Sequence, residues 1–188
     1  MAAEKLYDLW AGRNPQWEIR YEELIKNFCD YGKGETSLRE ARGKLFGAGY
    51  ELYIVAFFIG LYYKQCKPLI EDNTKRKGFG QPIQYWGNIE SRSGRKAYPK
   101  IREYIFSALI ARTDVDFIAL EKGELSPRKA VDMLVQTMEE YANFGFHFIK
   151  EKTEDDPNYF YKETAFLEIF LSFDASEQSE EDEPDSLD

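Results

Sequence analysis

The stretch ELYIVAFFIGLYY, residues 51–63, decides the fold of this 188-residue chain. Its last twelve positions form the longest predominantly apolar run in the sequence, and Glu51 and Lys64 bracket that run closely. A transmembrane helix needs about 20 such residues, so the run is too short to cross a bilayer. A helix that is apolar on nearly every side must be buried among other elements. We therefore expect a central, buried helix over residues 49–65.

A second long helix is expected in the C-terminal half of the chain. Ser126 followed by Pro127 is typical of a helix start, because a serine side chain caps the first amides and proline suits the first turn. Apolar or small residues then recur every three or four positions, which is the helical period. They are Val131, Leu134, Val135, Met138, Ala142, Gly145 and Ile149.

Shorter helical patterns occupy residues 15–32, the stretch after Pro99, and residues 162–173. No clear pair of alternating strands accompanies them, and the aromatic content of 16% supplies large side chains for a core. The sequence therefore predicts an all-α fold, a single-domain helical bundle of five to seven helices that spans residues 1–173.

The charge of the chain is unevenly distributed. The net charge is −9, but residues 64–102 contain ten basic and three acidic side chains, which gives +7. Residues 174–188 contain eight acidic side chains and no basic one. A stretch so acidic and so poor in apolar residues is typical of disorder. We therefore predict an acidic disordered tail at residues 174–188.

The basic segment gives the best local signal for binding. Residues 70–97 show no period and are rich in turn-forming residues, which predicts a long basic loop with a short strand or turn at residues 82–86. Cations that neutralise phosphates, beside rings that stack on bases, are what nucleic-acid binding requires. The candidate nucleic-acid or partner contacts are Lys75, Arg76, Lys77, Tyr85, Trp86, Arg92, Arg95 and Lys96. The alternatives are charges that only keep the loop solvated, contact with the chain's own acidic tail, and an acidic protein partner.

The stretch MEEYANFGFHFIK, residues 138–150, places Gly145 on the apolar stripe of the second long helix. Glycine inside a helix costs about 1 kcal/mol relative to alanine, so its presence indicates a role in packing or in ending the helix. If Gly145 lets another helix backbone come close, leucine should overpack this position and alanine should be tolerated. If the helix ends at Asn143, Gly145 takes a positive φ instead. We favour a continuous or slightly kinked helix.

Sequence motifs do not indicate an enzyme. YGKGETS, residues 31–37, lacks the spacing of a phosphate-binding loop, and Cys29 and Cys66 lack metal-type spacing. His147 is the one imidazole, and general acid–base catalysis would require a hydrogen-bonded partner beside it. We predict a cytoplasmic protein with no membrane segment, metal, cofactor or catalytic residue. The alternative is a small hydrolase in which acidic residues and His147 line a cleft beside Trp86.

Two stretches resemble one known family. ELYIVAFFIGLYYKQCKPL, residues 51–69, resembles the central helix of the small DNA phosphorothioation (dnd)-system-associated accessory proteins, the fourth family of that kind. In that family an apolar helix ends in a glycine, a few basic residues and Pro-Leu. MEEYANFGFHFI, residues 138–149, resembles the C-terminal EEYANGG-type signature of the same family. The order and separation of the two blocks also agree.

The resemblance implies a non-enzymatic accessory factor of a bacterial DNA modification, restriction or phage-defence system. Such a factor would bind a protein partner of that system, DNA, or both, and the family offers no catalytic residue to transfer. Tyr141, Ala142 and Gly145 would be a structural signature that holds the C-terminal helix against the central one. This chain departs from the family pattern at Phe144, where a glycine is expected, in its longer basic loop and in its acidic tail.

Overall fold

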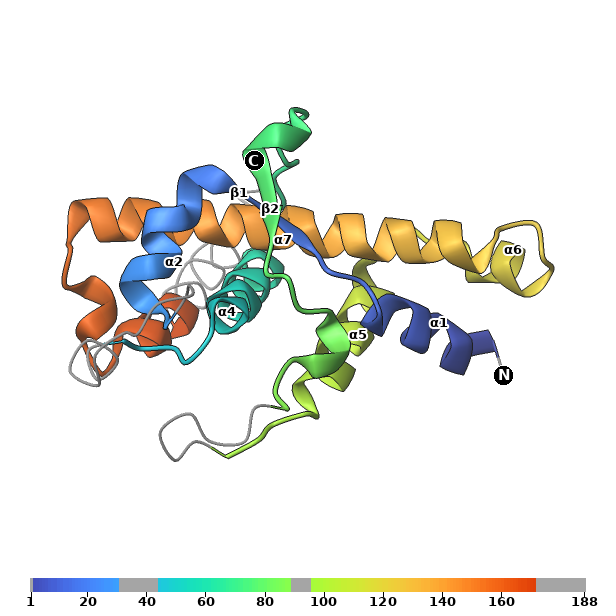
Figure 1. Ribbon diagram of the computed structural model, residues 1–188, viewed down its shortest axis with the longest axis horizontal. Helices are drawn as coiled ribbons and strands as arrows, with labels where there is room; N and C mark the ends of the chain where they lie inside the picture. Colours follow the sequence, from blue (N-terminus) through green and yellow to red (C-terminus); the bar gives the residue numbers. More distant parts are fainter. Residues whose placement is uncertain (1, 31–43, 89–95, 172–188) are drawn as a thin grey trace, which may run out of the picture.

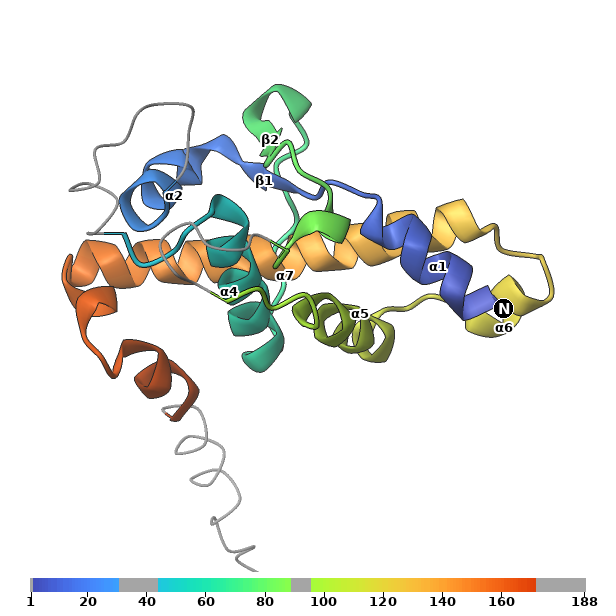
Figure 2. The ribbon, with the colours of Figure 1, turned by 60° about the horizontal axis from the view of Figure 1, so that its bottom comes forward.

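The computed structural model describes residues 2–30, 44–88 and 96–171, and its longest element is α7, Pro127–Asp155 (Figure 1). The helix begins where the sequence predicts, because the Ser126 hydroxyl accepts a hydrogen bond of 3.3 Å from the amide of Lys129. The 29 residues of α7 form a rod about 43 Å long at about 1.5 Å per residue. The other described helices pack along this rod (Figures 1 and 2).

Helix α4, Gly49–Tyr62, crosses the middle of α7 (Figure 2). Its buried residues lie on several faces of the helix, as expected for a segment without a polar side. The predicted central, buried helix is therefore confirmed, with an end at Tyr62 rather than at residue 65.

Different groups of elements pack near the two ends of α7 (Figures 1 and 2). Near its start lie three helices, α1 (Ala2–Ala11), α5 (Ile101–Arg112) and α6 (Phe117–Glu121). Near its end lie α2 (Glu22–Phe28), the 3-10 turn η4 (Tyr159–Tyr161) and helical residues 165–171. The described molecule is thus mostly α-helical and is organised by one long helix.

The described residues are mostly α-helical, as predicted, but they also contain one short two-stranded sheet. Strand β1, Gln16–Glu18, pairs in antiparallel fashion with β2, Arg76–Gly78, and Trp17 lies opposite Lys77. The helix predicted over residues 15–32 is present only as α2, because β1 and a 3-10 turn, η1 (Ile19–Tyr21), precede it. The helical spacing was misleading because pairing with a distant strand, which the local sequence cannot show, determines the conformation of Trp17.

The described part of residues 70–97 contains short ordered elements instead of one long loop. The turn η2, Asn73–Lys75, leads into β2, and Asp72 caps it by accepting a hydrogen bond of 2.9 Å from the amide of Thr74. A second 3-10 turn, η3 (Ile83–Tyr85), falls where a strand or turn was predicted. The predicted acidic tail lies outside the described residues and stays a prediction.

Candidate functional site

The first cationic cluster of the basic segment, residues 75–77, makes contacts within the chain. Lys77 Nζ lies 3.1 Å from Glu22 Oε1, and Lys75 Nζ lies 3.7 Å from Asp72 Oδ2. The Arg76 Nε donates a hydrogen bond of 2.5 Å to a backbone carbonyl oxygen. The hydrogen bond from Lys77 is the largest of the effects that lower the pKa of the Glu22 carboxyl. Exposed ion pairs contribute only about 0–1 kcal/mol, so these contacts orient the cations without holding them strongly.

Trp86 does not offer a face for stacking. It is fully buried, and the Tyr50 ring stacks on it at a centroid distance of 5.3 Å and an interplanar angle of 8°. A second α4 ring, Tyr53, packs on it edge-to-face at a centroid distance of 5.7 Å, and the indole Nε1 donates a hydrogen bond of 3.1 Å to the Gln81 carbonyl oxygen. The prediction that Trp86 contacts a ligand is therefore wrong. For the same reason, Trp86 does not line a cleft of the kind that the hydrolase alternative proposed.

Two parts of the basic segment meet at Gly87. The Tyr98 amide donates a hydrogen bond of 2.8 Å to the Gly87 carbonyl oxygen, and the Arg102 guanidinium donates to the carbonyl oxygen of Gln84. Gly87 has a φ of 77°, and a Cβ atom there would lie 2.7 Å from the Tyr98 carbonyl oxygen. Only glycine adopts this conformation and tolerates this approach without strain. The turn η3 and the start of α5 therefore lie side by side.

The side chains around this junction form a small cationic surface with aromatic rings. We name it the basic surface, and its residues are Tyr85, Lys96, Tyr98, Lys100 and Arg102. Tyr85 is 48% exposed, Tyr98 is 37% exposed, and both lysines are exposed. The Tyr98 hydroxyl donates a hydrogen bond to the carboxylate of Glu51. Burial, and after it that hydrogen bond, raises the pKa of Tyr98, so the hydroxyl remains a donor.

The predicted contact residues lie in different parts of the molecule. Tyr85 and Lys96 belong to the basic surface, whereas Trp86 lies in the core. Arg92 and Arg95 lie outside the described residues. Tyr98 was not predicted as a surface ring, although its place between Lys96 and Lys100 could have indicated it.

The predicted structural signature lies where α4 and α7 cross. A Cβ atom on Gly145 would lie 2.6 Å from Ala56 Cα, and one on Gly60 would lie 2.9 Å from the Tyr141 carbonyl carbon. Ala142 is fully buried beside them. Gly145 is thus inside a continuous helix and permits close contact, and the alternative of a helix end at Asn143 is wrong. This geometry argues against the expectation that alanine is tolerated at Gly145, because one methyl group there already overlaps the Ala56 backbone.

A buried polar contact beside this crossing was not predicted. Asn143 is 2% exposed and its Nδ2 donates a hydrogen bond of 2.9 Å to Oε1 of Glu18, which is 4% exposed. The same Nδ2 lies within hydrogen-bond distance of two backbone carbonyl oxygens that follow α4. The other carboxylate oxygen of Glu18 lies 2.6 Å from Arg20 Nε. This cluster links β1, α7 and the chain after α4. In the sequence, only the position of Asn143 next to the apolar stripe of α7 could have indicated it.

His147 lies on a partly solvated face of α7. Its side chain is 36% exposed, and its Nε2 lies 3.4 Å from Oε1 of Glu151, one turn further along the helix. Such a pair is common on helix surfaces. Among the residues that the structure describes, no three His, Cys, Asp or Glu side chains are grouped so that they could hold a metal ion.

No protein-family model, curated protein or solved structure matches this chain. Within residues 2–30, 44–88 and 96–171, no helix combines the length and the apolar character needed to cross a membrane.

Proposed function

We propose that this protein is a non-enzymatic accessory factor of a bacterial DNA modification, restriction or phage-defence system. It binds a protein partner of that system and contacts DNA through the basic surface. One observation carries the DNA contact: the hydrogen bonds between η3 and the start of α5 bring exposed rings and exposed lysines to one place. The resemblance of residues 51–69 and 138–149 to the dnd-associated accessory family supports the biological setting.

The chemistry of the basic surface favours unpaired DNA. Lys96 and Lys100 can neutralise phosphates, and each such contact releases counterions and makes binding sensitive to salt. The exposed ring of Tyr85 can stack on a base, a contact worth about 1–3 kcal/mol per base. Stacking on a ring requires a base that is free of its partner strand, so we propose single-stranded DNA as the ligand. Arg102, which bonds the Gln84 carbonyl oxygen, positions this surface.

The predicted acidic tail adds an opposing charge. Residues 174–188 contain eight acidic side chains, and the basic segment has a net charge of +7. Opposite charges in one chain attract each other at low salt, so the tail competes with DNA for the basic segment. Deleting residues 174–188 therefore strengthens DNA binding, and the gain fades as salt rises because charges are screened over about 8–10 Å near physiological ionic strength.

Fluorescence anisotropy with a labelled single-stranded oligonucleotide tests this function. In the chain without residues 174–188, Tyr85→Ala weakens binding through the lost stacking contact. The double variant Lys96→Ala/Lys100→Ala weakens binding and reduces the slope of log K against log salt by about 1.4, since each lost phosphate contact removes about 0.7 for a single strand. The matched control is Arg128→Ala/Lys129→Ala, which makes the same charge change at exposed residues of α7.

Two results overturn the DNA contact. One is no binding by the shortened chain even at low salt, and the other is an equal loss of affinity in the control variant. Either result assigns the basic surface to an acidic protein partner. A pull-down from the native host, with and without nuclease, then separates direct protein partners from partners bridged by DNA.

A further inference from the structure

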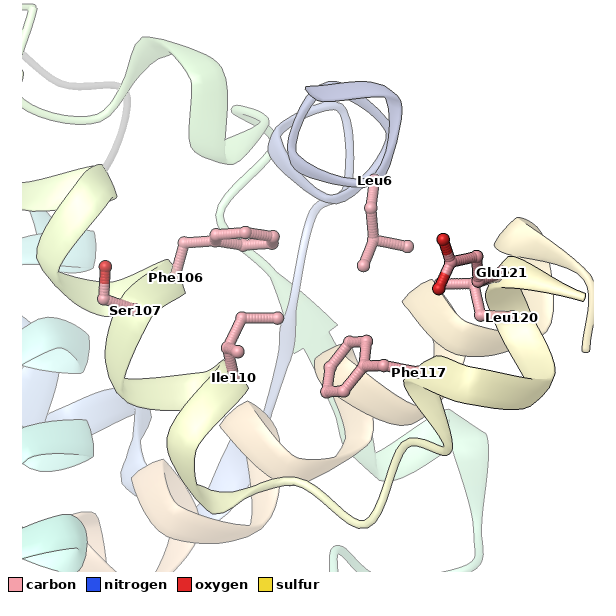
Figure 3. Close-up of a pocket in the computed structure, with 7 residues that line it drawn as sticks. All are labelled: Leu6, Phe106, Ser107, Ile110, Phe117, Leu120 and Glu121. Atoms are coloured by element: carbon pink, nitrogen blue, oxygen red, sulfur yellow. The ribbon is translucent and has the colours of Figure 1, made fainter. Parts of the chain in front are cut away.

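Helices α1, α5 and α6 line an open apolar pocket of about 510 Å³ near the start of α7 (Figure 3). Figure 3 shows side chains that enter it from all three helices. Its lining residues are Leu6, Phe106, Ser107, Ile110, Phe117, Leu120 and Glu121. The volume lies within the range of about 300–1,000 Å³ that is common for ligand pockets.

One wall of this α1–α5–α6 pocket is held in place by aromatic packing. The Phe106 ring lies 5.2 Å from the Tyr7 ring and 5.3 Å from the Trp10 ring, so contacts with α1 fix its position. By contrast, Phe117 and Leu120 on α6 are only half-buried. The pocket is therefore preformed, open to solvent and lined by incompletely covered apolar walls.

Apolar surface continues outside the pocket on the same helices. Ile118, next to Phe117 on α6, is 66% exposed, and Leu9, one turn after Leu6 on α1, is 48% exposed. Exposed apolar surface that extends around a cavity is typical of protein interaction sites. An occupant that covers both the pocket and these flanking residues must be larger than a small molecule.

The rim of the pocket is acidic. Residues 101–124, which form α5, α6 and their connections, contain five acidic and three basic side chains, a net charge of −2. Glu121 belongs to the lining itself and is exposed. Glu103 precedes the lining residue Ser107 by four positions, so both lie on one face of α5. A complementary occupant is apolar on one side and positively charged on the other.

We propose that the α1–α5–α6 pocket binds a basic amphipathic helix of a partner protein. The apolar face of that helix enters the pocket between Leu6, Ile110 and Phe117, and its lysines or arginines face Glu121 and the acidic rim. This is the helix-in-groove mode, in which apolar anchors spaced three or four residues apart fill a hydrophobic groove. The inference goes beyond the DNA contact, because none of the pocket residues belongs to the basic surface.

Titration with designed peptides tests the proposal on the full chain. The probe is a labelled amphipathic helix of leucine and lysine. Its controls are the same design with glutamate in place of lysine, and a leucine–lysine peptide of identical composition whose order destroys the amphipathic face. The proposal expects binding of the first peptide alone, with an affinity that falls as salt rises because the rim contacts are screened.

Two protein variants with matched controls locate the binding. Ser107→Trp fills the mouth of the pocket, and Asn27→Trp places the same side chain at an exposed residue of α2, near the other end of α7. We expect Ser107→Trp to lose affinity on the order of tenfold. Glu121→Lys removes the acidic lining group, whereas Glu163→Lys makes the same charge change at an exposed residue near the other end of α7. The two controls bind as the unchanged chain does.

Three outcomes overturn the proposal. If the glutamate peptide or the reordered peptide binds equally well, the pocket does not select a basic amphipathic helix. If a variant and its control lose the same affinity for the peptide, the pocket is not the binding site. Self-association of the unchanged chain that Ser107→Trp abolishes would make a second copy the occupant. Thermal melts of all four variants accompany the titrations, and if Ser107→Trp does not fold, the pair Glu121→Lys and Glu163→Lys decides.

Discussion

The crossing of α4 and α7 and the α1–α5–α6 pocket show opposite ways of packing apolar helices. At the crossing, the backbones are so close that a Cβ atom on Gly145 or Gly60 would overlap the facing helix. At the pocket, three helices leave about 510 Å³ unfilled. Both regions are built from apolar side chains, so apolar composition alone does not determine how closely helices approach.

The spacing of small residues explains the difference. Ala56 and Gly60 are four positions apart on α4, and Tyr141 and Gly145 are four apart on α7, so each pair lies on one face of its helix. Gly60 lies against the Tyr141 backbone, and Gly145 lies against the Ala56 backbone. The pocket instead receives large side chains from α6, a helix of five residues that is too short to cover it. The interiors of proteins are normally packed as densely as organic crystals, so the crossing is structural and the pocket is free to bind.

The largest expected effect compares one phenylalanine from each region. Phe146 is fully buried, with the Tyr21 ring 5.3 Å and the Tyr53 ring 5.8 Å away. Phe146→Ala should lower the free energy of unfolding by about 3–5 kcal/mol, the usual cost of deleting a buried ring. Phe117→Ala should cost about 1 kcal/mol or less, because one side of that ring already faces the pocket. Urea denaturation measures both, and equal costs would show that the pocket wall is part of the core.

An intermediate effect is expected from adding one methyl group at the crossing. Gly145→Ala gains about 1 kcal/mol of helix propensity, but overlap with the Ala56 backbone forces the helices apart. Overpacking costs about 1–3 kcal/mol and occasionally more, so we expect a net loss of stability, and a larger loss for Gly145→Leu. The control is Gly12→Ala, whose new Cβ atom would meet its nearest neighbours at an ordinary 3.5 Å and 3.6 Å. A thermal melt of Gly145→Ala at or above that of the control would contradict this prediction.

The smallest expected effect concerns one carboxyl group of α7. Glu139 lies on α7 and accepts a hydrogen bond of 2.7 Å from the amide of Gln16, and burial raises its pKa in the folded chain. The folded chain therefore holds the proton of the Glu139 carboxyl more tightly than the unfolded chain does. As a result, stability falls as pH rises from about 4.5, the ordinary pKa of glutamate, through the raised pKa of the folded chain. Glu139→Gln should reduce the slope of stability against pH, while its amide oxygen can still accept the hydrogen bond from the Gln16 amide.

A change of a pocket residue that does not titrate is the control for this pH dependence. Ser107→Ala should leave the slope of stability against pH unchanged. Urea denaturation at a series of pH values measures both variants. The prediction fails if the slope of Glu139→Gln equals that of the unchanged chain.

Some features of this protein follow from its sequence alone. The apolar run of α4, the Ser126–Pro127 start of α7 and the position of Gly145 on its stripe were predicted and are present in the structure. Each depends on residues within a few turns of one another, through helix propensity, capping and the 3.6-residue period. The acidic tail and the setting in a DNA-modification or defence system stay predictions.

Other features were decided only by tertiary structure. Trp86 belongs to the core because Tyr50 and Tyr53 cover it, and β1 exists because β2 pairs with it across about sixty positions of the sequence. The contact of Glu18 with Asn143 and the α1–α5–α6 pocket likewise join segments far apart in the chain. The local sequence cannot predict such features, because the free energy of burying a ring or pairing a strand depends on partners that only the folded chain brings together.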